Sequence, residues 1–392
     1  MRLFQTIILF FIICTLNSCS SGGSSSSNSG FLSAKPDKKW EAGKDYFVVK
    51  RYRVEDAHGF GEPVVAYSLL LPDQWKVDGG ITWRVGHYCV NESVSNRMTA
   101  TSADHQFQLD FFPLRSWEWS DDPYVQQSKQ GNQGVFKTCD FMPAMDADAY
   151  LKNEFVHDMG DPKVISIEPN PEVGKAMEEQ AKKNSANMAA AGINTVKYNP
   201  SAIRAKLKFA DGSEGLALCA VNQTIFYMQN FMTGGYTGSY TCQADQKIVL
   251  RYPAGKEAEA RKLLSMAVTS IRINPQWQTA VAKFFNNVSK VEQVENAKRS
   301  EIWRKSQADI AEIQKSTWEY QQQSQDRIAE ETGRVLRGVE QWSDPATGQS
   351  ADLSAGYNEA WAKGDGTYIL SNDPLFDPNV ALQEDWKKLS KK

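Results

Sequence analysis

The stretch IRAKLKFADGSEGLALCAVNQ, residues 203–223, decides the fold. Residues 203–209 and 214–223 are two runs with strand composition, and the pair Asp211-Gly212 between them favours a tight turn. The stretch therefore predicts an antiparallel β-hairpin, and the rest of the folded chain is interpreted around it.

Strand signals continue on both sides of this hairpin. After it, residues 225–232 and 242–252 are expected to be strands, separated by the glycine-bearing loop 233–238. Before it, short β-branched or aromatic runs recur, and most of their connections are too short for helical crossovers, which favours an antiparallel sheet. These earlier runs are 46–52, 64–71, 81–88, 93–101, 106–112 and 164–167.

Three segments carry helix signals. They are 146–157, 171–191 and 255–269. Asp146 and Asp148 lie where acidic side chains complement the dipole at a helix start, and Gly192 is a fitting helix end. Residues 113–140 lack such a pattern and are expected to form an irregular, aromatic-bearing loop. The fold class expected for residues 40–273 is α+β, an antiparallel β-sheet with packed helices.

A long helical region, 274–340, is expected next. Asn274-Pro275 is a capping residue followed by proline at the first helical position. The apolar seam that follows is Trp277, Val281, Phe284, Val288 and Val291. A stalk or partner-binding helix is one interpretation, and an α-hairpin with a break near Ser300 or Gln322 is the other. The seam is not sustained over the three or four heptads of a coiled coil, which favours the hairpin.

Residues 341–392 predict a turn-rich C-terminal module of short strands. In chain order they carry the patterns D-P-x-T-G, G-Y-x-x-A-W, Y-I-L-S and F-D-P-N. This order resembles the C-terminal tail of uncharacterised bacterial exported proteins. The resemblance implies a family marker and no particular chemistry.

The N-terminus carries a targeting signal. A short apolar run closes on Leu16-Asn17-Ser18-Cys19, which resembles the lipobox of bacterial lipoproteins. The resemblance implies a signal peptide over residues 1–18 and lipidation of Cys19. Residues 19–39 are rich in Ser and Gly and predict a flexible tether. The expected location is the cell envelope, as an outer-membrane lipoprotein held by its lipid anchor, facing either the periplasm or the outside.

Several short motifs of the core resemble the Mog1/PsbP/DcrB-like fold. They are Leu71-Pro72-Asp73-Gln74-Trp75, the turn and strand over 102–113, and the helix end running into Ser270-Ile271-Arg272-Ile273-Asn274-Pro275-Gln276-Trp277. The resemblance covers residues 45–277. It implies an antiparallel sheet with helices packed against it, and an accessory or binding protein without a shared catalytic site.

Four cysteines remain once the leader and the lipobox are set aside. An even number in an oxidising compartment predicts two disulfides, with three connectivities open. Sequence proximity favours Cys89 with Cys139 and Cys219 with Cys242. In a three-strand meander over 214–250, however, the second pair would lie about 10 Å apart, too far for a disulfide.

Several function classes lack their sequence signals. The net charge of -3 offers no extended positive field, so nucleic acid is not an expected partner. The four histidines, His58, His87, His105 and His157, form no metal-ligand pattern. No nucleophile elbow and no phosphate-binding loop occur. We therefore expect no catalytic residues, no metal and no cofactor.

Aromatic residues near loops are the remaining candidates for a binding surface. They are Trp117, Trp119, Tyr124, Tyr236 and Tyr240. Such side chains can stack on a sugar or a peptide, although most aromatics serve the core. The leading hypothesis is a lipid-anchored envelope accessory protein that binds an envelope protein or glycan. The alternatives are an envelope hydrolase acting on glycan or peptide through an unrecognised site, and a structural spacer.

Overall fold

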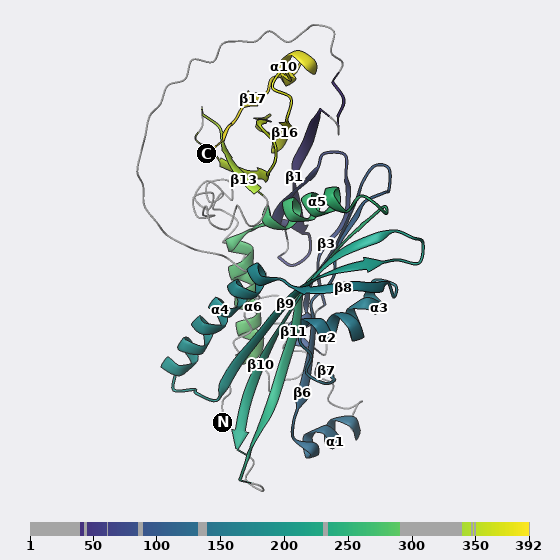
Figure 1. The fold of residues 1–392 in the computed structure, drawn as a ribbon. Coiled ribbons are helices and arrows are strands. Elements are labelled where there is room, and N and C mark those ends of the chain that lie inside the picture. The colour runs from purple at the N-terminus through teal and green to yellow at the C-terminus, as the bar shows by residue number, and fades with distance from the viewer. Residues whose placement is uncertain are drawn as a thin grey trace.

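A computed structural model describes residues 40–42, 45–60, 62–84, 89–131, 139–229, 234–290, 339–345, 348 and 350–391. These residues form an α+β fold of antiparallel sheets with packed helices, as the sequence predicts (Figure 1). The expected signal peptide and tether, residues 1–39, lie outside the described residues. Residues 291–338, most of the expected long helical region, lie outside them too.

The hairpin over residues 203–223 lies in the largest sheet, next to its β8 edge (Lys163–Pro169). Strand β9 (Val196–Lys208) pairs with β10 (Glu214–Gln229), and the turn between them has Gly212 at a φ of 87°, a value that favours glycine. β10 pairs in turn with β11 (Tyr236–Tyr252) along its whole length. The expectation of two strands over 214–232 is wrong in one respect, because β10 runs through as one continuous strand.

This sheet has nine strands among the described residues. Its main order is β3-β4-β5-β11-β10-β9-β8, and β6 pairs with both β11 and β7. The further strands are β3 (Lys76–Trp83), β4 (Val94–Thr101), β5 (Gln108–Phe111), β6 (Arg115–Ser120), β7 (Asp140–Phe141) and β8 (Lys163–Pro169). The expected loop 113–140 is therefore wrong for its first half, which forms β6 and helix α1 (Pro123–Gly131). An exposed edge of β11 favours such pairing, because its backbone groups need partners.

A second sheet joins the two ends of the described chain. Its order is β12-β2-β1-β16-β15-β17. The members are β1 (Tyr46–Asp56), β2 (Val64–Pro72), β12 (Arg272–Ile273), β15 (Glu359–Ala362), β16 (Thr367–Ser371) and β17 (Lys387–Lys388). Tyr46 of β1 lies opposite Ser371 of β16. The C-terminal stretch thus shares a sheet with the first strand.

The remaining C-terminal elements complete this end of the molecule. A three-stranded sheet is formed by β14 (Ser350–Ser354), β13 (Val339–Ser343) and β18 (Ser390–Lys391). The short helix α10 (Pro378–Ala381) lies between β16 and β17 in the chain. An aromatic cluster consolidates the module: Phe376 stacks on Tyr46 with centroids 4.7 Å apart and meets Trp361 edge-on. The early strand β1 therefore contributes to the core of the late module.

The main core lies between the sheets and is closed by two helices. α5 (Glu257–Thr269) and α6 (Pro275–Lys290) contribute buried apolar side chains, among them Leu264, Trp277 and Phe284. The predicted helix start at Asn274-Pro275 is confirmed, with Asn274 Oδ1 accepting a hydrogen bond from the Gln276 amide. The buried Asp56 carboxylate accepts hydrogen bonds from two indoles, those of Trp83 and Trp277.

A second core lies on the other face of the large sheet. It is covered by α2 (Ala147–Tyr150), a single π-helical turn η2 (Leu151–Phe155) and α3 (Val156–Asp158), which together make one helical segment. Asp146 Oδ1 caps it by accepting from the Ala149 amide at 2.8 Å, as the sequence predicts.

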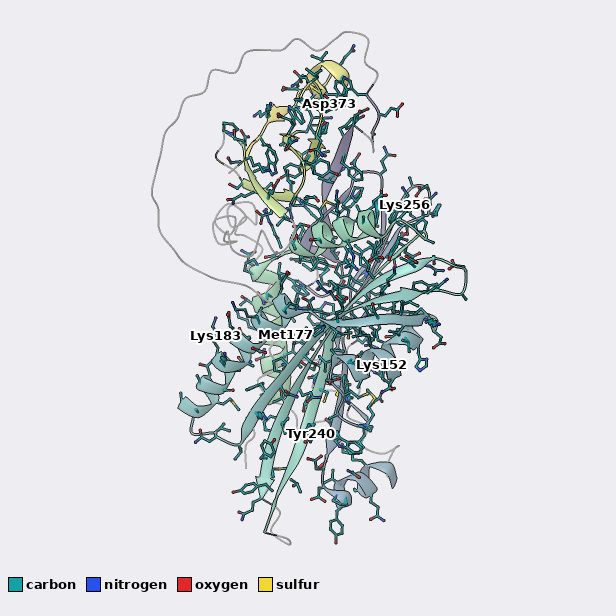
Figure 2. The ribbon with its side chains drawn as sticks, viewed as in Figure 1. Lys152, Met177, Lys183, Tyr240, Lys256 and Asp373 are labelled. Carbon is teal, nitrogen blue, oxygen red and sulfur yellow. A yellow bond between two sulfur atoms is a disulfide. The ribbon has the colours of Figure 1, made fainter. Side chains whose placement is uncertain are left out.

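The expected helix over 171–191 is also confirmed. α4 (Pro171–Ala190) packs on β9, burying Met177 while Lys183 stays exposed, a division that can be followed in Figure 2. Gly192 follows its end with a φ of 77°, a left-handed conformation that stops the helix.

The cysteines pair only in part as expected. Cys89 and Cys139 form a disulfide, which confirms that pairing, whereas Cys219 and Cys242 are buried free thiols. These two lie on adjacent strands, opposite Lys247 and Gln223 respectively. At about 3.3 Å per residue, a register offset of four residues separates them by roughly 13 Å, beyond disulfide reach. Burial raises the pKa of both thiols to about 12.

Candidate functional site

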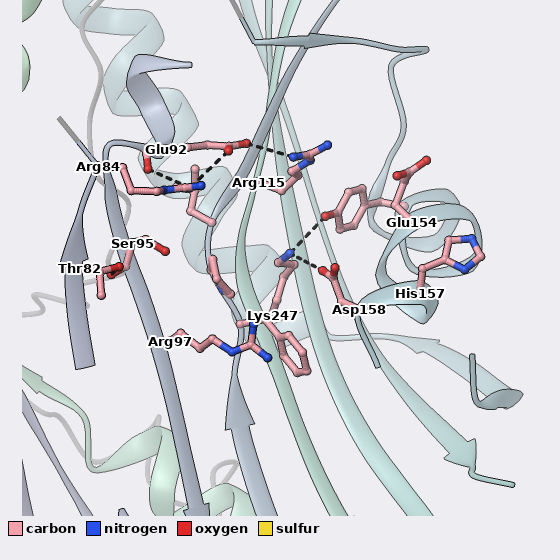
Figure 3. A pocket seen from close by; sticks show the side chains of 14 residues that line it. Thr82, Arg84, Glu92, Ser95, Arg97, Arg115, Glu154, His157, Asp158 and Lys247 are labelled. Carbon is pink, nitrogen blue, oxygen red and sulfur yellow. Dashed lines mark hydrogen bonds and ion pairs between the residues drawn. The ribbon is translucent and has the colours of Figure 1, made fainter. Parts of the chain in front are cut away.

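A cleft of about 560 Å³ opens between the strand pair β3–β4 and the helical segment η2–α3. Figure 3 shows the two walls, with Thr82, Arg84, Ser95 and Arg97 on one side and Glu154, His157 and Asp158 on the other. The segment between β5 and β6 and one residue of β11 line the space between the walls. Four segments that are distant in sequence thus contribute to a single concave site.

Lys247 of β11 is a buried cation of this cleft. Its side chain is 3% exposed, and its ammonium donates to Asp158 Oδ2 at 2.8 Å and to the Tyr150 hydroxyl at 3.4 Å. The ammonium also lies 5.3 Å from the centre of the Phe155 ring. An ammonium has three N–H donors, and two of them have partners among the described residues, which leaves a third for a ligand.

The buried environment changes the proton affinity of this cluster. Desolvation lowers the pKa of Lys247, and the ion pair with Asp158 partly offsets that effect. Burial, followed by the Asp158 charge, raises the pKa of Tyr150, so its hydroxyl stays protonated at neutral pH. Tyr150 is held in place by stacking on Trp117, with ring centroids 4.9 Å apart.

A buried carboxylate orients two guanidinium groups at the rim of the cleft. Glu92 lies in the short turn η1 (Val90–Glu92), directly after the disulfide cysteine Cys89. Its Oε1 accepts from the Ser116 amide at 2.9 Å and lies 3.8 Å from Arg115, and its Oε2 lies 3.5 Å from Arg84. The disulfide and Glu92 together fix where the arginines point.

The charges of the cleft are nearly balanced but not all paired. Four cationic side chains, of Arg84, Arg97, Arg115 and Lys247, face three carboxylates, of Glu92, Glu154 and Asp158. Of these, Arg97 and Glu154 form no ion pair with another described residue. They lie on opposite walls (Figure 3). Arg97 is exposed and Glu154 is half-buried, so both side chains can be reached from solvent.

The helix wall of the cleft contains a π-helical turn. The π-helical turn over Leu151–Phe155 widens the helix by one residue just before Asp158. Such turns occur often at functional sites. Its sequence signal is weak, and the expected helix over 146–157 does not foresee it.

The five aromatic residues selected from the sequence fall into two groups. Trp117 is fully buried in the second core and donates its indole N–H to the Pro143 carbonyl, so it is not a surface residue. The other four gather at the far end of the β10–β11 hairpin, where α1 lies (Figure 1). We call this region the aromatic end; it comprises Trp119, Tyr124, Tyr236 and Tyr240.

Within the aromatic end, exposure differs sharply. Tyr124 and Tyr236 are 68% and 69% exposed. Trp119 is half-buried against Phe141, and Tyr240 is half-buried and donates its hydroxyl to Asp121 Oδ2 at 2.8 Å. Burial and the Asp121 carboxylate raise the pKa of Tyr240 to about 12. None of these residues lines the cleft.

The histidines do not converge. His157 lines the cleft rim, but its Nδ1 lies 2.5 Å from Asp161 Oδ1 and both side chains are exposed. His58 and His105 belong to other parts of the fold, and His87 lies outside the described residues. Within the described ranges, no cluster of three or more His, Cys, Asp or Glu side chains is arranged to hold a metal ion. No helix there has the length and apolar character needed to cross a membrane.

Sequence reasoning selected none of the cleft residues as functional, and it considered only His157 among them. Lys247 gives little local signal, because it directly follows the polar residues Asp245 and Gln246 and precedes Ile248-Val249-Leu250. Arg97 and Glu154 look like ordinary surface charges in the sequence. A scan against protein-family models finds no match for this sequence, and a search of curated proteins finds no similar one. Function is therefore inferred from the cleft and from the sequence.

Proposed function

We propose that the chain is a lipid-anchored accessory protein of the cell envelope that binds a charged ligand in the cleft and does not catalyse a reaction. The observation that carries the proposal is the buried Lys247, whose ammonium lines a cleft rimmed by arginines. Burying an ammonium is costly, and a merely structural role would be served by an apolar side chain.

Binding accounts for the cleft better than hydrolysis does. Glycoside hydrolysis needs two carboxyl groups on opposite sides of the scissile bond. Glu154 and Asp158 instead stand on the same helical wall, and Asp158 is engaged by Lys247. The third carboxylate, Glu92, is buried and already engaged by Arg84, Arg115 and the Ser116 amide. An envelope hydrolase therefore stays the second candidate, favoured only by the presence of His157 beside these carboxylates. A structural spacer stays a third, and it would leave the cleft without a role.

The location is proposed from the sequence. Cys19 would carry the lipid, residues 19–39 would tether the domain, and the outer membrane would hold the anchor. Because a single acyl chain anchors a protein only marginally, more than one chain is expected on Cys19. Replacing Cys19 by Ala should release a folded protein from the membrane fraction. A variant that still fractionates as a processed membrane lipoprotein would contradict the anchor.

The finer fold is also a proposal. The core would belong to the Mog1/PsbP/DcrB-like class, supported by an antiparallel sheet with α5 packed against it and followed by β12 and α6. That class is associated with accessory and binding roles, which agrees with a protein that carries a ligand or a partner. The partner would be an envelope protein or glycan, and the aromatic end is the surface for it.

Native mass spectrometry of the full chain purified from envelopes tests the binding function. We expect a non-covalent adduct on the wild type that is lost in Lys247→Met. Methionine has a similar shape and leaves Asp158 partly solvated, so thermal melting should show a folded variant. Lys197→Met, an exposed lysine on β9, is the matched control and should keep the adduct. No adduct on the wild type, or an adduct indifferent to Lys247→Met, would count against the proposal.

A further inference from the structure

We infer that the ligand of the cleft is zwitterionic and peptide-like, with its carboxylate on the β3–β4 wall beside Arg97 and its ammonium on the helix wall beside Glu154. This inference rests on the proposed binding function and goes beyond it by specifying the chemical class and the orientation of the ligand. It is carried by the juxtaposition, across one cleft, of two oppositely charged side chains that have no ion-pair partner among the described residues.

The strand wall offers hydrogen-bond donors. Thr82 lies opposite Ser95 in the β3–β4 pairing, and Arg84 and Arg97 each lie two residues further along the chain, so all four side chains belong to one face. Arg84 is partly engaged by Glu92, with its Nη2 bonded to the Glu92 carbonyl at 3.1 Å. Arg97 forms no ion pair with another described residue, and a planar guanidinium can bind a carboxylate with two parallel hydrogen bonds.

The helix wall offers an acceptor. Asp158 is neutralised by Lys247 at 2.8 Å, and His157 is paired with Asp161, which leaves Glu154 as the unpaired carboxylate of that wall. An unpaired carboxylate accepts charge-assisted hydrogen bonds from an ammonium group. The potential therefore changes sign from one wall to the other, and a dipolar ligand would be aligned across the cleft.

The space between the walls suits a peptide backbone and an apolar side chain. Phe112, Pro113 and Leu114 supply apolar surface, and Phe112 is held edge-on against Phe155 at 5.2 Å. The remaining donor of Lys247 can bind a peptide carbonyl. A simple anion such as phosphate would face the Glu154 carboxylate, and a polycation would face two arginines, so both are disfavoured.

Calorimetric titration with three related dipeptides tests the inference. The probes are alanyl-phenylalanine, its C-terminal amide and its N-acetyl derivative, at pH 6.5, where the free α-amino group is protonated. We expect the zwitterion to bind about tenfold more tightly than either derivative, because a charge-assisted hydrogen bond contributes roughly what a tenfold affinity change requires. Inorganic phosphate serves as the simple-anion probe and should bind more weakly than the zwitterion.

Two variants locate the two ends of the ligand. Arg97→Gln should remove the preference for the zwitterion over the amide, and Glu154→Gln should remove the preference over the N-acetyl derivative. The exposed ion pair of Arg204 and Glu168, on β9 and β8, supplies matched controls. Arg204→Gln and Glu168→Gln should leave both preferences unchanged.

Three results would overturn the inference. The first is that the N-acetyl derivative or phosphate binds at least as tightly as the zwitterion does. The second is that the preferences for the zwitterion survive in Arg97→Gln and Glu154→Gln. The third is that no dipeptide binds to the wild type. The proposed function fails separately, because it depends on an adduct that is lost in Lys247→Met. An adduct of that kind together with any of the three results would retain cleft binding and reject a zwitterionic peptide-like ligand.

Discussion

The cleft and the aromatic end share strand β11 but are built in opposite ways. Lys247 is a charged side chain that the fold buries, and Tyr236, eleven residues earlier, is a large aromatic side chain that it leaves 69% exposed. The cleft collects side chains from four segments, whereas the aromatic end needs only α1, β6 and one hairpin. Residue type alone therefore marks the second region and misses the first.

The sharpest test of this comparison uses Trp117, an aromatic residue that lies in the core behind both regions. Trp117→Ala should lower the free energy of unfolding by about 3–5 kcal/mol, because it opens a cavity and removes the ring on which Tyr150 stacks. Urea denaturation measures the effect. A loss below about 1 kcal/mol would mean that Trp117 is a surface residue after all.

The disulfide links the two regions, since Cys89 precedes the Glu92 turn of the cleft and Cys139 precedes β7. The double variant Cys89→Ser with Cys139→Ser should lose about 2–4 kcal/mol of stability, the range typical of a disulfide that closes a loop of this length. Denaturation of the wild type with and without reductant should give a similar loss. Equal stability with and without reductant would contradict a structural disulfide.

Asp245 lies on β11 between the two regions, at the point where the β10–β11 register shifts. Its Oδ1 is buried without a hydrogen bond among the described residues, and burial raises its pKa to about 7. Between about pH 4 and pH 7 the folded state therefore binds a proton that the unfolded state lacks, so the free energy of unfolding falls as pH rises through that window.

Asp245→Asn cannot ionise and should remove this dependence. We expect the variant to be more stable than the wild type by about 1–3 kcal/mol above pH 7, because a buried charge without a partner is costly. Near pH 4 the two proteins should be equally stable. Denaturation at several pH values measures the difference, and a difference that does not change with pH would contradict the burial of the carboxylate.

Asp211 is a useful control with the opposite sign. Hydrogen bonds from Ser213, and then the Arg251 guanidinium, lower the pKa of its carboxyl. Its contribution to stability is present above its unfolded pKa and is lost as pH falls through the folded value. Asp211→Asn should therefore have a lower free energy of unfolding than the wild type at neutral pH and a similar one in acid.

The smallest effects are expected at the aromatic end. Tyr124→Ser and Tyr236→Ser should each change the free energy of unfolding by less than about 0.5 kcal/mol, because both side chains are exposed. If the aromatic end contacts an envelope partner, cross-linking to that partner should fall while stability is retained. A large loss of stability in either variant would place these side chains in a core instead.

Much of the fold was predictable, because local patterns specify it. The hairpin around Asp211-Gly212, the helix capped by Asp146 and the helix start at Asn274-Pro275 all depend on residues within a few positions of one another. The prediction of a loop over 113–140 was wrong because β6 is stabilised by pairing with β11, more than a hundred residues away. Local signals cannot report a partner at that distance.

The candidate site was not predictable for the same reason. Arg97 and Glu154 belong to no recognisable sequence pattern. They line the same cleft only because the fold places β4 across from the π-helical turn. The second expected disulfide also depended on tertiary structure. Its cysteines lie on neighbouring strands, but the register of β10 against β11 keeps them apart.

The amino-acid sequence by itself determined the α+β class, the hairpin around Asp211-Gly212 and the ends of several helices, because turn chemistry, capping and periodicity act over a few residues. The tertiary structure alone decided that β16 pairs with β1, that Trp117 is a core residue and that Lys247 is a buried charge in a cleft. Burial and strand pairing depend on which distant segments meet, and that choice is made by the packing of the whole chain.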